Sequence, residues 1–174
     1  MTVGQTLERR AVEVDADRFR EAMARLAAPV VVVTTRYGER DWGMTASAVM
    51  SVSLDPPLVT VGIARTAGCH RALTRAPEFV INVLGDRQQD LARRFAGRGV
   101  DRFAGGGTDA LPGSGLPVVR GAGVVCRCER WDVVTVGDHD LLIGRPVAIE
   151  LAETAGDPLL WYRRSFGRAA PAPM

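Results

Sequence analysis

Four hydroxyl residues stand at alternate positions of the segment GMTASAVMSVSLDPP, residues 43–57: Thr45, Ser47, Ser51 and Ser53. The residues at the positions between them are apolar: Met44, Ala46, Ala48, Met50, Val52 and Leu54. Side chains on a strand point alternately to the two faces of a sheet, so the pattern predicts one strand over 43–54. We expect its apolar residues to fill a core. The hydroxyls then line a cleft or, alternatively, face solvent.

The rest of the chain predicts short strands with a few helices. Helical spacing of apolar residues favours a helix over 15–27, with Asp15 or Asp17 as its N-cap and Pro29 after its end. Two further helices are expected over 69–76 and 87–96, and a long surface loop over 104–115. Runs rich in β-branched residues predict strands over 30–35, 58–64, 79–84, 118–134 and 141–153. Strands with short connections predict a mainly β, antiparallel barrel with helices as lids.

Composition limits the kinds of partner. A chain of 174 residues with a net charge of +2 predicts a single globular domain with no affinity for nucleic acid or a membrane surface. No apolar run approaches the length of a membrane span, and no apolar leader follows the first residues, so we expect a soluble cytoplasmic protein. Three cysteines without a CxxC spacing fit a reducing compartment.

Common catalytic and nucleotide motifs are missing from the sequence. The glycines at 105–107 have no strand directly before them and no helix directly after, as a dinucleotide-binding turn requires. With only His70 and His139 available, a histidine metal cluster is excluded and no metal is expected. A ring with several carbonyls and ring nitrogens, such as flavin, suits a wall of hydroxyls and backbone amides, because these groups can donate or accept.

The order of segments from about Phe19 to Phe166 resembles the flavin reductase family of FMN-binding split barrels, the reductase components of two-component monooxygenases. The segments that carry the resemblance are GMTASAVMSVSLDPPLV, FVINVL, DLARRFA, LPVVRGAGVVCRC, VGDHDLLIGRPV and DPLLWYRRSF. The resemblance implies a six-stranded antiparallel Greek-key split barrel with flanking helices, in one domain over 1–174 with its core at about 16–168. It also implies a homodimer that binds FMN or FAD in a cleft between its subunits.

The resemblance assigns the hydroxyl segment to the flavin. It implies that four residues receive the phosphate and ribityl chain: Thr45, Ala46, Ser47 and Ala48. It implies that three residues run beside the isoalloxazine: Ser51, Val52 and Ser53. Relatives often carry a second serine where this chain has Ala48, so one hydroxyl contact is missing and the backbone N–H would serve alone.

Two further segments carry cofactor candidates. Where relatives show a hydroxyl pair spaced S-x-T, this chain has Thr66 and Gly68, with Arg65 as a phosphate partner; the alternative is a helix start without a ligand. Asn82 resembles a family position close to the flavin, and a buried asparagine bonded to backbone is the alternative. The segment WYRRSF adds three candidates for stacking and phosphate contacts: Tyr162, Arg164 and Phe166.

His139 follows a Gly-Asp turn and has a carboxylate on each side, Asp138 and Asp140, which favour its protonated form. By itself this pattern is typical of a histidine that stabilises a turn. The resemblance places His139 at the nicotinamide side of the flavin, where it would hydrogen-bond the carboxamide or a pyrophosphate.

The activity implied is an NAD(P)H-dependent flavin reductase that supplies reduced FMN or FAD to a separate monooxygenase. Hydride passes between the two cofactors, so the protein has to position them and exclude water. The alternatives are a flavin-dependent oxygenase on the same barrel and a non-catalytic flavin-binding protein. The sequence does not choose NADH or NADPH, FMN or FAD, nor identify the monooxygenase.

Overall fold

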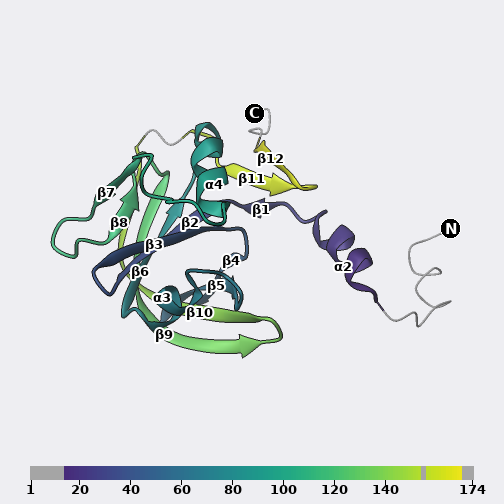
Figure 1. Cartoon of the computed structure of the whole chain (residues 1–174), viewed down its shortest axis with the longest axis horizontal. Helices are drawn as coiled ribbons and strands as arrows, with labels where there is room; N and C mark the ends of the chain where they lie inside the picture. The colour runs from purple at the N-terminus through teal and green to yellow at the C-terminus, as the bar shows by residue number, and fades with distance from the viewer. Residues whose placement is uncertain (1–13, 154–155, 170–174) are drawn as a thin grey trace.

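The computed structural model describes residues 14–153 and 156–169, so predictions about the first residues lie outside the described part (Figure 1). The helices are α2 (Ala16–Met23), α3 (His70–Arg75), the 3-10 turn η1 (Asp86–Gln88) and α4 (Gln89–Ala96). The strands are β1 (Ala28–Pro29), β2 (Val31–Tyr37), β3 (Arg40–Ala46), β4 (Val49–Leu54), β5 (Pro57–Ala64), β6 (Glu78–Val83), β7 (Thr108–Ala110), β8 (Pro117–Val119), β9 (Val124–Val136), β10 (His139–Leu151), β11 (Leu159–Tyr162) and β12 (Ser165–Arg168).

One antiparallel sheet dominates the fold, in agreement with the mainly β prediction. Its seven strands run in the order β3-β2-β6-β9-β10-β5-β4, so β3 and β4 form its two edges. The expected number was six, and the hydrogen-bonded ladder does not close into a barrel. Smaller sheets join β1, β11 and β12, and pair β7 with β8. The pair β7 and β8 occupies part of the stretch that the sequence predicted as one long loop.

The sheet carries a hydrophobic cluster on each of its two faces, so β2 is buried on both sides. Val31 and Val33 pack in a first cluster with residues such as Phe79 and Leu142. The alternating Val30 and Val32 belong to a second cluster, which α4 and β11 complete. A strand that is covered on both sides reads as a continuous apolar run, which explains the sequence VVVV at 30–33.

The segment predicted as one strand over 43–54 forms two strands. β3 ends at Ala46, and the chain leaves the strand conformation at 47–48 before β4 begins. Met44 and Ala46 face the first core cluster, as expected for the apolar set. The strict alternation in the sequence therefore does not correspond to one continuous strand.

The prediction that the apolar residues of β4 fill a core is wrong for most of them. Met50 is 61% exposed and Leu54 93% exposed, while Val49, on the other face, packs against the core. The register against β5 shifts between Ser51 and Ser53, which is a bulge in this edge strand. The break at 47–48 and this bulge together change which side chains point inward.

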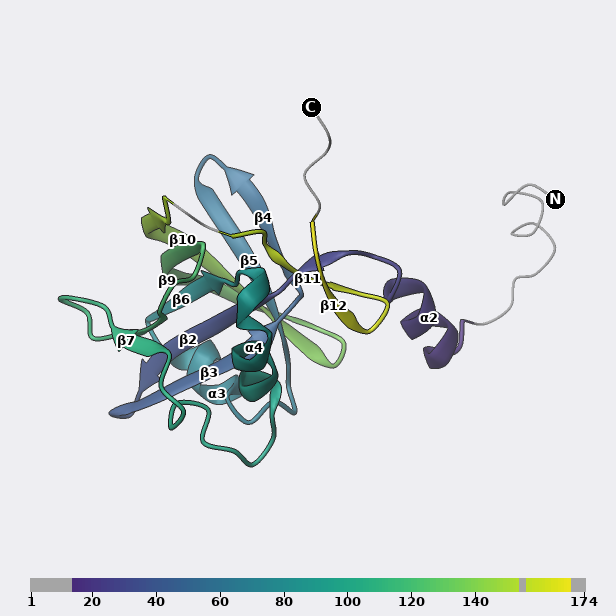
Figure 2. The ribbon, with the colours of Figure 1, turned by 90° about the horizontal axis from the view of Figure 1, so that it is seen from above.

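The first helix begins where the sequence indicated, since Asp15 is the N-cap and accepts a hydrogen bond from the Arg18 N–H at 2.7 Å. Unlike α3 and α4, α2 buries none of its residues. Figures 1 and 2 show it standing beside the sheet rather than on it. The apolar face of α2 carries Phe19 and Met23, and both are exposed, as is Leu26 shortly after the helix.

Candidate functional site

The link between β3 and β4 crosses closely over β5. The Gly62 N–H donates to the Ala48 carbonyl at 2.8 Å. A Cβ at position 62 would lie 3.0 Å from the Ala48 Cβ, closer than most real Cβ contacts, so this approach favours a glycine. Ser47 and Ala48, both flavin candidates, are thereby held exposed on the outer face of β5.

The turn between β9 and β10 lies at the end of the same surface. His139 pairs with Ala64 of β5, and Leu141 pairs with Gly62, so His139 is two residues along the strand from the crossing. His139 and Leu141 share a face of β10, and that face is the one on which Ala48 lies near Gly62. Two residues of a strand span about 7 Å. The structure thus brings His139 into the neighbourhood of the 47–48 segment.

The loop after β5, which carries Arg65, Thr66 and Gly68, starts beside the β9–β10 turn. The Arg65 N–H donates to the Asp138 carbonyl at 3.0 Å, which joins the loop to the β9–β10 turn. The side chains of Arg65 and Thr66 are exposed beside it. Three segments that the sequence analysis singled out separately therefore meet at one end of the sheet.

Only one of the two carboxylates beside His139 contacts its ring. The Asp138 Oδ1 lies 2.7 Å from Nδ1, and this contact lowers the pKa of Asp138 through a hydrogen bond and the imidazole charge. The expectation that Asp140 also acts on His139 is wrong. Successive side chains of a strand point to opposite faces, so Asp140 faces inward and contacts His70. Nε2 of His139 is left for a ligand.

The remaining hydroxyl candidates have different surroundings. Thr45 donates its hydroxyl to the Ala92 carbonyl of α4 at 2.7 Å, which fixes α4 on the sheet. Ala46, beside it, is buried in the core. Ser51 and Val52 are exposed on β4, and Ser53 is half-buried. Of the hydroxyl row, Ser47 is the side chain that stands free at the crossing point.

Asn82 is a structural residue, so its assignment beside the flavin needs correction. It is fully buried, and its amide nitrogen donates to the Val32 carbonyl at 2.9 Å. Its amide oxygen accepts the Val119 N–H at 2.8 Å. The side chain joins β2, β6 and β8, as the alternative interpretation held.

The three C-terminal candidates lie elsewhere in the subunit. The β11–β12 hairpin packs beside α4, on the opposite side of the molecule from α3 and the β9–β10 turn (Figure 1). The ring centroids of Phe166 and Trp161 lie 5.0 Å apart in an edge contact, and the Arg93 guanidinium lies 5.0 Å from the Phe166 centroid, so Phe166 already has partners within the chain. Tyr162 is exposed, and Arg164 lies 3.8 Å from Glu21. The fold of the chain does not bring these residues to His139.

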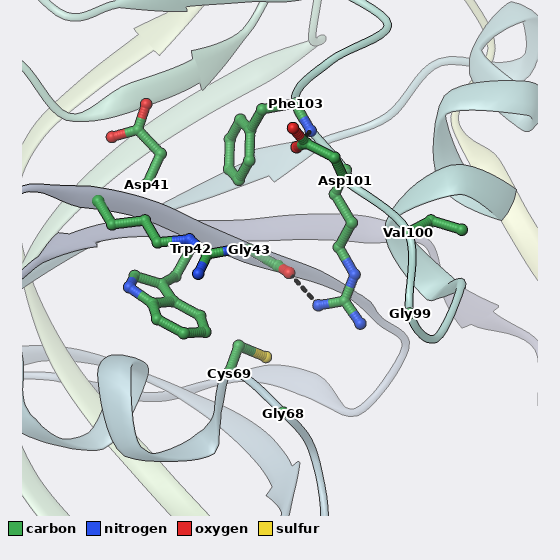
Figure 3. A pocket seen from close by; sticks show the side chains of 11 residues that line it. Asp41, Trp42, Gly43, Gly68, Cys69, Gly99, Val100, Asp101 and Phe103 are labelled. Carbon is green, nitrogen blue, oxygen red and sulfur yellow. Dashed lines mark hydrogen bonds between the residues drawn. The ribbon is translucent and has the colours of Figure 1, made fainter.

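A pocket of about 370 Å³ opens next to Gly68 and was not foreseen from the sequence. Trp42 and Cys69 lie on one side of it and Phe103 and Asp101 on the other (Figure 3). Its lining is completed by Arg40, Asp41, Gly43, Gly99, Val100 and Arg102. The pocket extends the site from the loop after β5 towards the segment that follows α4.

Arg102 is one of two arginines that line this pocket, with Arg40. Its guanidinium donates to the Gly43 carbonyl at 2.5 Å, drawn in Figure 3, and twice to the Gly97 carbonyl. A guanidinium has five N–H groups, so two remain for an anion. Burial raises the pKa of the neighbouring Cys69 thiol although Arg102 opposes the shift, so Cys69 is no activated nucleophile. The sequence offered only an arginine near a phenylalanine after α4, which is too common a pattern to single out.

Within residues 14–153 and 156–169, no three side chains of His, Cys, Asp or Glu gather closely enough to hold a metal ion. No helix in the same ranges has the length and apolar character needed to cross a bilayer. The Sγ atoms of Cys126 and Cys128 are 3.6 Å apart as free thiols.

The site is made of hydroxyls, backbone amides, one imidazole and the guanidinium groups of Arg40, Arg65 and Arg102 on an antiparallel sheet. Such groups position a ligand rather than react with it, which defines the class as a β protein that binds a cofactor or nucleotide. A family model, the flavin reductase like domain, matches residues 23–170. The chain belongs to this family.

Named relatives share most of their length with this chain. The NADH:riboflavin 5'-phosphate oxidoreductase of Streptomyces pristinaespiralis is 52% identical, with 88% of each chain covered. The reductase component of 4-hydroxyphenylacetate 3-monooxygenase of Thermus thermophilus is 35% identical, over 87% of this chain and 95% of that protein. The solved NADH:FAD oxidoreductase of Streptomyces globisporus, in complex with NAD and FAD fragments, superposes with a TM-score of 0.84 at 31% identity, covering 92% of this chain and 98% of that one.

Proposed function

We propose that this protein is an NADH-dependent flavin reductase. The observation that carries the proposal is the meeting of three segments at one end of the sheet: Ala48 bonded to Gly62, and Arg65 bonded to Asp138 beside His139. The arrangement offers a row of neutral donors and acceptors next to one imidazole, in a family whose named relatives reduce flavins with NADH. Hydride is transferred from nicotinamide to flavin, and the side chains bind and orient the two.

The residues present fit a flavin. When bound, the isoalloxazine supplies the hydride acceptor. The two free N–H groups of Arg102 and the amide of Gly68, in one pocket, are suited to its phosphate. Ser47 and the backbone at Ala48 are suited to the ribityl chain. Because the crossing at Gly62 fixes the 47–48 segment, these contacts are preorganised rather than formed on binding.

His139 is suited to the nicotinamide. Asp138 holds Nδ1, which orients the ring and leaves Nε2 free. A carboxamide has both a donor and an acceptor, so it can bond to Nε2 in either protonation state of the imidazole. The role of His139 is therefore to orient nicotinamide, without taking part in hydride transfer itself.

A second copy of the chain fits the exposed apolar surface. Met50, Val52 and Leu54 lie along β4, an unpaired edge of the sheet, and the apolar face of α2 is equally uncovered. An apolar edge strand in water invites association. We propose that a homodimer of single-domain split barrels buries this surface, and that the flavin cleft lies beside it. In such a dimer, Tyr162, Arg164 and Phe166 of one copy could lie near the flavin cleft of the other.

The reduced flavin would be used by a separate enzyme. The Thermus thermophilus relative is the reductase component of a two-component monooxygenase. By analogy, this reductase would supply a monooxygenase in the cytoplasm by releasing reduced flavin.

The test is a steady-state assay that crosses NADH and NADPH with riboflavin, FMN and FAD, without an organic substrate. A reductase oxidises NADH rapidly as soon as free flavin is added. An oxygenase on the same fold would turn over only with its organic substrate, and a flavin-binding protein would not turn over at all. Either of these results would contradict the proposal.

A further inference from the structure

A second histidine forms a hydrogen-bonded network beneath the site. Nε2 of His70 lies 2.7 Å from Oδ2 of Asp140, and the Thr135 hydroxyl donates to Oδ1 of the same carboxylate at 2.8 Å. The side chain of Asp140 is 11% exposed and that of His70 is 22% exposed. Thus both oxygens of a nearly buried carboxylate have specific partners. The pKa of Asp140 is lowered, first by the Thr135 hydroxyl and then by His70, with the Arg65 charge adding to the shift.

The network lies on the face of β10 opposite to that of His139, where Asp140 is buried, His70 is half-buried and Thr135 is exposed. Asp140 follows His139 directly on β10, and strand alternation points their side chains in opposite directions. Thr135 is the residue opposite Asp140 on β9. His70 is the first residue of α3, directly after the loop that carries Arg65, Thr66 and Gly68. Asp140 is therefore the point at which β9, β10 and the start of α3 are joined.

The two segments joined in this way have different ligands in the proposed function. The loop before His70 is the flavin side, and the turn before Asp140 is the nicotinamide side. The β5–β10 ladder ends at the pair of His139 and Ala64. Beyond that pair, apart from the network, the bond from the Arg65 N–H to the Asp138 carbonyl ties the loop to the turn at the surface. A surface bond that water can replace orients the segments less firmly than a nearly buried, charge-assisted pair.

We propose that His70, Asp140 and Thr135 form a positioning network for hydride transfer, which fixes the flavin loop and the His139 turn relative to each other. None of the three residues touches a ligand. Their effect is transmitted through the loop on one side and through His139 on the other. This inference rests on the proposed function, because it assumes that the loop binds flavin and that the turn binds nicotinamide.

An isosteric pair of threonine variants tests the network. Thr135→Val removes the hydroxyl bonded to Asp140. Thr74→Val removes a hydroxyl that donates to the His70 carbonyl at 2.8 Å within α3 and leaves Asp140 untouched. We expect Thr135→Val to raise both the dissociation constant of FMN and the KM of NADH, each by about 3- to 10-fold. Thr74→Val should change neither constant, even where it lowers the melting temperature as much as Thr135→Val does.

Conservative replacements in the network should restore the binding of both ligands. Thr135→Ser restores the hydroxyl, and His70→Gln keeps a donor near the position of Nε2, so both should bind FMN and NADH as the wild type does. His70→Leu should match Thr135→Val. Should Thr135→Val fail to fold, the comparison of His70→Gln with His70→Leu decides the question in the same way.

The proposal is overturned if Thr135→Val and His70→Leu bind both ligands as the wild type does, or if Thr74→Val weakens binding as much as they do. The wild-type assay keeps this outcome separate from a failure of the proposed function. A wild type that does not oxidise NADH with free flavin contradicts the function itself. A fully active wild type with unaffected network variants contradicts only the network.

Discussion

Arg102 holds two carbonyl groups of the chain and still has two N–H groups that face a pocket. If these groups bind the flavin phosphate, Arg102→Met should weaken FMN binding by about 10-fold or more, the value expected for a charged hydrogen bond. Riboflavin, which lacks the phosphate, should bind Arg102→Met and wild type alike. Fluorescence quenching titrations measure both constants.

The matched control is Arg98→Met, an exposed arginine of the same segment that does not line the pocket. It should leave FMN affinity unchanged. Equal losses for FMN and riboflavin in Arg102→Met would mean that Arg102 only supports the backbone at Gly43 and Gly97.

His139 gives the second test at the scale of a residue. His139→Ala should raise the KM for NADH and slow flavin reduction, at a cost of roughly 1.5 to 3 kcal/mol, while FMN affinity and melting temperature stay near wild type. Stopped-flow reduction of flavin-bound protein measures binding and hydride transfer without product release. A histidine that only stabilises the turn would instead lower the melting temperature and weaken both ligands together.

The motifs pointed to segments that lie together in the fold, but they did not reveal the long-range contacts of individual residues. The motifs drew attention to 45–48, 65–68 and His139, and the structure gathers Ala48, Arg65 and His139 at one end of the sheet. Asp140 was assigned to the wrong histidine, because adjacency in sequence hides that strand neighbours face apart. Its true partner, His70, lies 70 positions away.

At the scale of elements, the contacts of Asp140 in the β9–β10 hairpin predict how the stability of the fold changes in acid. The pKa of Asp140 is lowered in the folded protein, so its contribution to stability is complete above the ordinary value of about 3.9 and is lost as pH falls through the lowered value. Urea unfolding of Asp140→Asn from pH 7 to pH 3 should therefore show reduced stability at neutral pH and a shallower decline in acid than wild type.

Asp90→Asn is the control for this experiment. Asp90 is on the surface of α4, where it pairs with Arg93 at 3.0 Å. Exposed pairs of this kind contribute little, so this variant should follow the wild-type profile. An acid decline in Asp140→Asn as steep as that of wild type would show that other carboxylates set the acid limit.

Helices and strands were predicted from the periodicity of apolar residues. The errors lie where the backbone changes direction without a change in that periodicity. The helices and most strands appear within a few residues of the expected bounds. The division of 43–54 into β3 and β4 was missed because Ser47 and Ala48 continue the alternation while the backbone turns. The bulge between Ser51 and Ser53 has no sequence signature of its own. The alternation of polar and apolar residues shows which side chains share a face. A backbone turn that leaves this alternation unbroken cannot be detected from it.

At the scale of the whole molecule, the proposed dimer predicts that one charge on the β4 edge separates the subunits. Leu54 is 93% exposed in one subunit, so Leu54→Asp has no cost for the isolated fold and a large cost in a dry interface. Sedimentation should give twice the 18.7 kDa chain mass for wild type and the single mass for the variant.

Val100→Asp serves as the control, since Val100 is also exposed but lies on the loop after α4 and outside β4 and α2. It should sediment as wild type does. A wild type that sediments as a monomer and binds flavin fully would contradict the dimer.

The separation of α2 from the sheet has a consequence for how the chain reaches its final state. An eight-residue helix is marginal in water by itself, and α2 buries none of its side chains within the subunit. In the proposed dimer, the partner surface that covers Phe19 and Met23 would supply free energy for forming this helix. With a second copy as that surface, helix formation is coupled to association. The proposed dimer therefore predicts that the helical content of the chain depends on protein concentration, and that dilution would unwind α2 without unfolding the sheet.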